Sequence, residues 1–148
     1  MFKLLSNLNN CIRWDAPAQA GEWPLISGQT GSMVSFDASG CELPTAGDVA
    51  VATIWSEGNR DGSAGFSPDI VDNGKLTLIA GGYRALTDNF TGTVNPGQSV
   101  KVGAAGQLVQ DGAGTAASIG YCTKSGVSVS KSVNGVQSTV TCIEVVIY

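Results

Sequence analysis

The chain has 148 residues, of which 43% are hydrophobic and 14% are charged, and its formal net charge is −4. Globular domains usually carry about 25% charged residues, so a surface this poor in charge favours contact with protein over contact with water. The sequence has no histidine, which excludes Ser-His-Asp and Cys-His catalysis and histidine-bound metals. Its eight lysines and arginines are scattered rather than clustered, which argues against nucleic-acid binding.

Residues 1–30 are predicted to form an extended N-terminal arm, followed by one β domain over residues 31–148. Asparagines in this segment interrupt helices, and prolines interrupt strands. Its large apolar side chains nevertheless require burial, among them Trp14, Trp23 and Ile26. The arm is therefore expected to pack either on its own domain or on a neighbouring subunit, and the sequence favours neither alternative.

From residue 32 onward, hydrophobic residues alternate with a period of two, which is typical of half-buried strands. Strands are predicted over 33–36, 48–55, 75–80, 81–87, 99–102, 107–110, 116–123, 127–133 and 136–148. In the second of these, one face is expected to carry Val49, Val51, Thr53 and Trp55. The last strand is apolar on both faces, so we expect it to be central in a sheet or to lie at an interface.

Turn signals separate these strands at short intervals. The Asn95–Gln98 sequence matches a type II turn, and Asn134-Gly135 matches the type I′ turn of a tight hairpin. No segment sustains helical spacing of apolar residues. The sequence therefore predicts an all-β fold, either a small barrel or a two-sheet sandwich with an extended N-terminal arm.

The four cysteines are far apart in sequence and contain no C-x-x-C pair, so neither a zinc ribbon nor a thioredoxin-like site is indicated. The first ten residues lack a secretory signal pattern, and no apolar run approaches the ~20 residues that span a bilayer. We therefore expect a cytosolic protein whose cysteines are small buried hydrophobes. Whether Cys122 and Cys142 pair is left open.

Candidate catalytic motifs are weak. Ser128 and Lys131 fit S-x-x-K, but that chemistry needs a helical turn, whereas this stretch alternates like a strand. The acidic residues of the 57–72 region match neither a calcium loop nor a sugar-cleaving pair convincingly, because surface loops gather such residues for solubility. We expect no enzyme, no cofactor and no metal site.

The longest loop signal spans 57–68, and aromatic and basic residues flank it. These side chains either pack in the core and anchor turns, or form a patch that docks on a partner. The residues with which we associate this loop surface are Trp55, Arg60, Phe66 and Arg84. Together with Trp14, Trp23 and Ile26 of the arm, they are the candidate partner-binding residues.

Four blocks of this region share a familiar pattern of residues and turns, namely Ile54–Arg60, Gly65–Asp69, Gly74–Leu78 and Gly82–Thr87. With the later stretches 95–103 and 106–109, they resemble small capsid decoration (cement) proteins of tailed bacteriophages. The resemblance covers about residues 45–148 and rests on the overall residue pattern and the spacing of turns, not on a diagnostic motif. Trp14 and Trp23 depart from the family's arm pattern.

The resemblance implies a virion protein assembled in the host bacterial cytoplasm and located on the capsid surface. Such proteins bind the outside of an expanded icosahedral shell, often as trimers, and clamp neighbouring major capsid proteins without an enzymatic site. We therefore expect the major capsid protein and further copies of this chain as partners, and neither nucleic acid nor membrane. The alternatives are a tail or head–tail connector protein, or a carbohydrate-binding β-sandwich on the virion surface that uses Trp55 or Tyr83.

Overall fold

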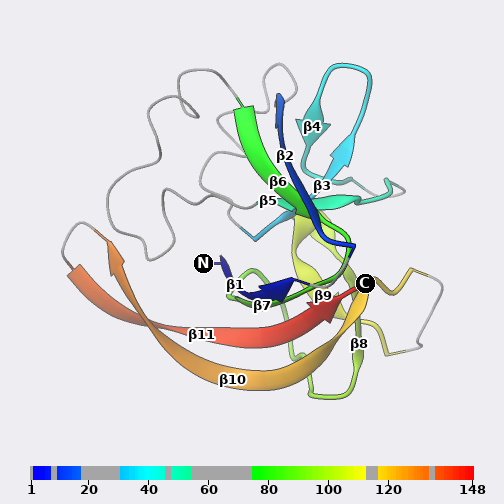
Figure 1. The fold of residues 1–148 in the computed structure, drawn as a ribbon. Coiled ribbons are helices and arrows are strands. Elements are labelled where there is room, and N and C mark those ends of the chain that lie inside the picture. Colours follow the sequence, from blue (N-terminus) through cyan, green and yellow to red (C-terminus); the bar gives the residue numbers. More distant parts are fainter. Residues whose placement is uncertain are drawn as a thin grey trace.

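The computed structural model describes residues 2–7, 10–17, 31–45, 48–54, 75–112, 117–133 and 136–148. These residues form two curled antiparallel sheets, which confirms the predicted all-β class (Figure 1). The six-stranded sheet has the order β1 (Phe2–Asn7), β7 (Tyr83–Thr87), β11 (Val136–Ile147), β10 (Gly120–Val133), β8 (Ser99–Val102) and β9 (Leu108–Gln110). The five-stranded sheet has the order β2 (Ile12–Pro17), β6 (Lys75–Ala80), β5 (Ala52–Ile54), β3 (Met33–Phe36) and β4 (Cys41–Glu42).

The turn predicted at Asn95–Gln98 is confirmed by backbone geometry, whereas the turn predicted at Asn134-Gly135 lies outside the described residues. In the Asn95–Gln98 turn the N–H of Gln98 donates to the carbonyl of Asn95 at 3.2 Å, and Gly97 has φ +82°, as a type II turn requires. A single turn of 3₁₀ helix, η2 (Ala104–Gly106), joins β8 to β9. Short turns of this kind allow the small strands of the six-stranded sheet to follow one another directly.

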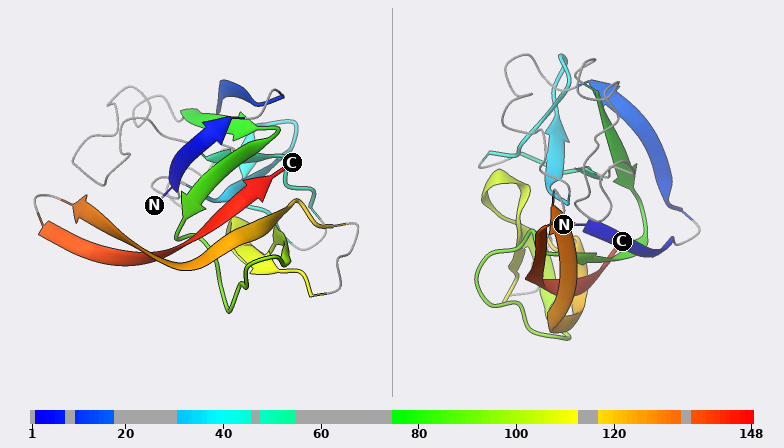
Figure 2. Two further views of the ribbon diagram at one scale, coloured as in Figure 1. Left: turned by 60° about the horizontal axis from the view of Figure 1, so that its bottom comes forward. Right: turned by 90° about the vertical axis from the view of Figure 1, so that its left-hand side faces the viewer.

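The two sheets are joined at one corner, where the chain passes from one sheet to the other at two neighbouring places (Figures 1 and 2). β1 pairs with β7 in one sheet, and in the other sheet β2, the next strand after β1, pairs with β6, the strand before β7. At the bend, Gly81 has φ +83°, and a Cβ atom there would lie 2.1 Å from the carbonyl oxygen of Asn10. The side chain of Asn10 accepts a hydrogen bond from the N–H of Gly82 at 3.0 Å. The boundary between the strands predicted over 75–80 and 81–87 is therefore a sheet-to-sheet corner that needs glycine.

The hydrophobic core is divided by the five-stranded sheet, whose successive side chains face opposite sides. Ile79 and Met33 join the larger cluster, which lies between the sheets, whereas Leu78 and Val34 join a smaller one on the other face. The six-stranded sheet and its connections contribute most of the larger cluster: Phe2, Tyr83, Ala85, Val94, Val100, Leu108, Cys122, Ile143, Val145 and Ile147.

A buried hydrogen-bonded chain links the two sheets inside the larger cluster. The Thr53 hydroxyl donates to the Met33 sulfur at 2.8 Å and contacts the Tyr83 hydroxyl. Since a thioether accepts but cannot donate, the Tyr83 hydroxyl must donate to Thr53. Burial raises the pKa of Tyr83, so the phenol keeps this proton. The ring of Phe2 packs edge-on against the Tyr83 ring, with centroids 5.7 Å apart.

The β10–β11 hairpin is longer than the strands that flank it. The two strands pair from Gly120↔Ile147 to Val133↔Val136, yet β7 pairs with β11 at 143–147 and β8 pairs with β10 at 120–121. The hairpin therefore extends beyond both neighbours, as Figure 2 shows. Its last strand is central where it lies between β7 and β10, which confirms that prediction.

One predicted strand is much shorter among the described residues. The strand predicted over 48–55 is reduced to Ala52–Ile54, and Val49 and Val51 are 76% and 49% exposed, so they do not share the burial of Thr53. Just before this segment, the Asp48 carboxylate accepts hydrogen bonds from the N–H and hydroxyl of Thr45 at 2.7 Å each, which holds a turn.

The strands predicted over 116–123 and 127–133 are one strand, β10, which begins at Gly120. Residues 124–126, which the sequence left between the two predicted strands, lie where the pairing of β10 with β11 is irregular, and Gly126 has φ +65°. The described part of the predicted N-terminal arm forms β1 and β2, so those residues pack on their own domain. Residues 18–30, with Trp23 and Ile26, lie outside the described residues.

We predict that Gly81→Ala destabilises the fold by about 3–5 kcal/mol, because both the positive φ and the Asn10 carbonyl oppose a side chain. The matched control is Gly97→Ala, which has nearly the same φ but no atom within 4 Å of the added Cβ. Its cost should be about 1–2 kcal/mol, from backbone strain alone. Urea unfolding of both variants measures the difference, and equal losses would show that the corner contact is not tight.

We predict that Thr53→Val costs more stability than Tyr83→Phe. The first leaves the buried Tyr83 hydroxyl without its acceptor, at about 1–3 kcal/mol, whereas the second removes one hydrogen bond, at about 0.5–1.5 kcal/mol, and leaves Thr53 donating to Met33. Thermal and urea unfolding of the two single variants test the order. The reverse order would mean that the donor assignment is wrong.

Candidate functional site

The outer face of the six-stranded sheet carries an unusual acid. Along β11, Ile143, Val145 and Ile147 face the larger core cluster, so the alternate residues face outward. One of these is Glu144, whose side chain is 5% exposed although it lies on the sheet's outer side. It pairs in register with Leu86 of β7 and Lys124 of β10.

The carboxylate of Glu144 is covered by cations and hydrogen-bond donors from both neighbouring strands. Arg84 of β7 approaches Oε1 through Nη2 at 2.7 Å and Nε at 2.9 Å. Lys124 of β10 lies 3.3 Å from Oε2, and the Thr123 hydroxyl donates to Oε1 at 2.6 Å. The cations remain partly in solvent, with 43% of the Arg84 side chain and 61% of the Lys124 side chain exposed.

These contacts hold the pKa of Glu144 below its ordinary value. The hydrogen bond from Thr123 is the largest cause, followed by those from Arg84 and Lys124 and the charge of Arg84, all opposed by desolvation. The acid is therefore ionised at neutral pH. A fixed carboxylate also fixes the guanidinium above it, since Arg84 contacts the acid through two of its nitrogens.

Two tyrosines lie next to this cluster on the same sheet. Tyr121 pairs in register with Val146, and its ring centroid is 6.1 Å from that of Tyr148. The two tyrosines are 38% and 63% exposed. The N–H of Tyr148 donates to the carbonyl of Ile119 at 3.0 Å, which ties the end of β11 to the segment before β10. We define the outer-sheet surface as Arg84, Tyr121, Lys124, Glu144, Val146 and Tyr148.

The outer-sheet surface has the composition of a binding face. Tyrosine and arginine are the residues that most often dominate protein interfaces, because they bury large amphipathic or planar groups. Nothing among its side chains resembles a nucleophile with an adjacent base. In the part of the chain that the structure describes, no three cysteine or acidic side chains gather as a metal site.

The structure places two of the seven predicted partner-binding residues. Arg84 lies on the outer-sheet surface, paired with Glu144. Trp14 lies in β2 of the other sheet, where its ring stacks on Phe36 with centroids 6.3 Å apart, and it is half-buried. The structure therefore does not bring these two together. The other predicted residues lie outside the described residues: Trp23, Ile26, Trp55, Arg60 and Phe66.

The suggestion that Tyr83 stacks on a sugar is wrong, because Tyr83 is 2% exposed and its hydroxyl is held by Thr53. The structure adds Tyr121, Lys124, Glu144 and Tyr148, which sequence reasoning missed as a group. One signal was present: Glu144 is the single charge in the apolar run from Val140 to Tyr148. A lone acid in a central strand requires a cation from a neighbouring strand.

All four cysteines lie among the described residues, and none of them forms a disulfide. Cys41, Cys122 and Cys142 are buried and Cys11 is half-buried, as expected for small hydrophobes. Cys122 faces the larger core cluster, whereas Cys142 shares the side of β11 that carries Glu144. Alternation along the strands therefore turns these two thiols to opposite faces of the sheet.

No family model, no curated protein and no solved structure matches this chain. Among the described residues, no helix is both long enough and apolar enough to cross a membrane.

We predict that Glu144→Gln flattens the acid side of the stability profile. Because the folded pKa of Glu144 lies below its ordinary 4.5, its contribution is complete above that pH and is lost as pH falls through the folded pKa. The wild type should lose about 1 kcal/mol more than the variant between pH 6 and strongly acidic pH. Urea unfolding across this range measures the effect, and parallel curves would contradict it.

Proposed function

We propose that this protein is a virion structural protein that binds the outside of an icosahedral capsid and stabilises contacts between major capsid proteins. It is proposed to act without catalysis, as a homo-oligomer on the capsid surface, with a trimer favoured. The outer-sheet surface is proposed as the face that meets the capsid. The observation that carries this assignment is the exposed tyrosine pair beside an arginine held in place by a buried carboxylate.

Preorganisation is what makes this face suitable for binding. A free arginine loses side-chain entropy when it docks, whereas Arg84 already contacts Glu144 through Nε and Nη2. Tyr148 is fixed by its backbone hydrogen bond to Ile119 and by its contact with Tyr121. Docking on this face therefore orders few additional side chains.

A low-charge surface also suits a repeated lattice. Each contact between a decoration protein and its shell needs little affinity by itself, because many copies and subunit bridging multiply the effect. A net charge of −4 over 148 residues limits repulsion between neighbouring copies. Binding energy is then expected to come from buried aromatic area rather than from long-range charge.

We predict that Tyr121→Ala and Arg84→Ala each weaken binding to expanded shells of the cognate major capsid protein by roughly tenfold or more, as expected for central interface residues. The matched control is Ile12→Ala, because Ile12 is 61% exposed on β2 of the other sheet. Co-sedimentation with shells gives the affinities, and shell melting temperature gives the stabilisation.

Loss of binding in all three variants would point to a general folding defect, which circular dichroism of each variant detects. Unchanged binding in Tyr121→Ala and Arg84→Ala would exclude the outer-sheet surface as the capsid-binding face. Wild-type protein that neither binds shells nor raises their melting temperature would overturn the proposed function. Rings or tubes in negative stain would instead favour a tail or connector component.

A further inference from the structure

The strands of the six-stranded sheet differ in charge from the rest of the chain. Five basic residues and a single acid lie in these strands, although the whole chain has a formal net charge of −4. The acid is Glu144, which is buried. The basic residues are Lys3, Arg84, Lys101, Lys124 and Lys131. Basic residues that are scattered in the sequence therefore gather on one sheet.

Alternation along the strands places basic side chains on the outer face of this sheet. On β1 and β8 the residues on either side of the lysine pack in the larger core cluster, so Lys3 and Lys101 face outward. Arg84 lies in an outward row, in register with Val146. The adjacent outward row crosses four paired strands through Lys3, Leu86, Glu144 and Lys124. The outer face therefore presents basic groups from β1, β7, β8 and β10.

The cluster around Glu144 keeps positive charge and hydrogen-bond donors for a second anion. Two cations contact one carboxylate, so the cluster has a net positive charge. Arg84 contacts this carboxylate through Nε and Nη2, which leaves its Nη1 group, and Lys124 contacts one oxygen of it. A guanidinium and an ammonium group have more N–H donors than these contacts use. Since both side chains are partly in solvent, a second carboxylate can reach them.

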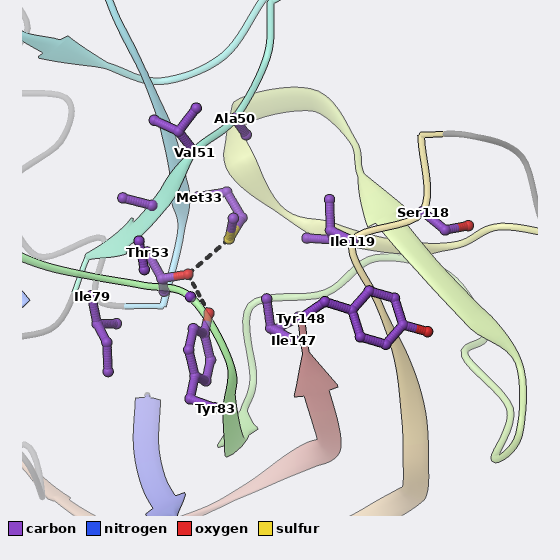
Figure 3. A pocket seen from close by; sticks show the side chains of 13 residues that line it. Met33, Ala50, Val51, Thr53, Ile79, Tyr83, Ser118, Ile119, Ile147 and Tyr148 are labelled. Carbon is purple, nitrogen blue, oxygen red and sulfur yellow. Dashed lines mark hydrogen bonds between the residues drawn. The ribbon is translucent and has the colours of Figure 1, made fainter. Parts of the chain in front are cut away.

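The tyrosine pair adds apolar area and a neutral donor beside these cations. Figure 3 shows the hydroxyl of Tyr148 turned away from the buried Thr53–Tyr83 pair. Because Tyr148 is exposed, this hydroxyl is accessible from outside. A partner that covers the tyrosines would also remove water from the neighbouring cations.

Covering the outer-sheet surface sets a requirement on the charge of the partner. An unpaired charge that loses its water is destabilising, whereas a hydrogen-bonded carboxylate offsets this loss. A partner with apolar or basic residues at this point would leave the excess charge of the cluster unpaired. A partner with an aspartate or glutamate opposite Arg84 and Lys124 would pair it.

A polyphosphate fits this face less well than a carboxylate. Nucleic-acid affinity comes from neutralising many phosphates at once. Here Arg84 and Lys124 already contact Glu144. Lys101 Nζ lies 3.6 Å from Oδ1 of the buried Asp111. The remaining excess of positive charge suits individual acidic side chains, and the negative net charge of the chain opposes a long polyanion.

We propose that the outer-sheet surface receives an acidic segment of a protein partner, in which one aspartate or glutamate bridges Arg84 and Lys124 while the tyrosine pair packs beside it. The chemistry of this site follows from the contacts above, and only the capsid as the source of the acid rests on the proposed function. The tyrosines supply most of the affinity. The cations select the partner, because complementary charge contributes to specificity and association rate more than to affinity.

The first experiment uses a hexaglutamate peptide as a probe and needs no shell. In NMR spectra of the wild-type protein, this peptide should shift the Arg84 Nε–H signal and the Tyr121 amide signal in a saturable way, and a hexalysine peptide should not. Lys124→Glu should weaken hexaglutamate binding by roughly tenfold. The matched control is Arg13→Glu, which makes the same change of charge at an exposed residue of β2 in the other sheet.

Three results of this titration would overturn the proposal. The first is the absence of hexaglutamate shifts in the wild type. The second is an equal effect of Lys124→Glu and Arg13→Glu. The third is a hexathymidylate oligonucleotide that binds more tightly than hexaglutamate, which would assign the face to nucleic acid. If circular dichroism shows that Lys124→Glu is unfolded, Lys124→Met takes its place, because it removes the charge and keeps an unbranched side chain.

The second experiment measures shell binding of the same variants. Lys124→Glu should weaken it by roughly tenfold, because an acid then faces the partner's acid, whereas Arg13→Glu should bind like the wild type. If Tyr121→Ala weakens shell binding and Lys124→Glu does not, the proposed function stands and the acidic partner is wrong. If hexaglutamate binds but shells do not, the proposed function fails and the acidic-ligand site stands. If Lys124→Glu lowers the sedimentation coefficient of the protein without shells and leaves shell binding intact, the acid belongs to a second copy of this chain, which contradicts the proposal.

Discussion

Gly81 lies against the backbone of Asn10, and this contact sets how the two sheets meet. The β1–β7 pair and the β2–β6 pair meet at this contact, which therefore sets the orientation of β7 relative to β6. In this orientation Tyr83 points into the space between the sheets, and Arg84 lies on the outer face of the six-stranded sheet. A side chain at residue 81 would push the strand pairs apart and misalign both faces.

The register of β11 decides which of its residues face the core and which face the outer side of the sheet. Its inward residues complete the core, whereas its outward residues include the acid that contacts Arg84 and Lys124. A slip of one residue would bury the wrong set on each side. The pairing of β11 with both β7 and β10 therefore specifies the core and the outer-sheet surface at the same time.

Glu144 is buried by neighbouring side chains and does not lie deep in the core. Glu144 lies on the outer side of the sheet, and its low exposure comes from the two long basic side chains that cover it. Such a group gains its charge stabilisation from short hydrogen bonds more than from a dry interior. This arrangement holds the basic side chains in place while much of each one remains in contact with solvent, as a surface made for binding requires.

Alternation of apolar residues and turn chemistry determined, by themselves, the β class, most strand positions, the type II turn at Asn95–Gln98 and the central place of the last strand. They failed at residues 48–51 and across Gly126, because a turn held by Asp48 and an irregular register are decided by contacts outside the local pattern. Tertiary structure alone decided that Trp14 stacks on Phe36 and that Tyr83 is buried. It also decided that Arg84, Lys124 and Glu144 meet, because strands distant in sequence become neighbours only after the sheet has formed and its register is fixed.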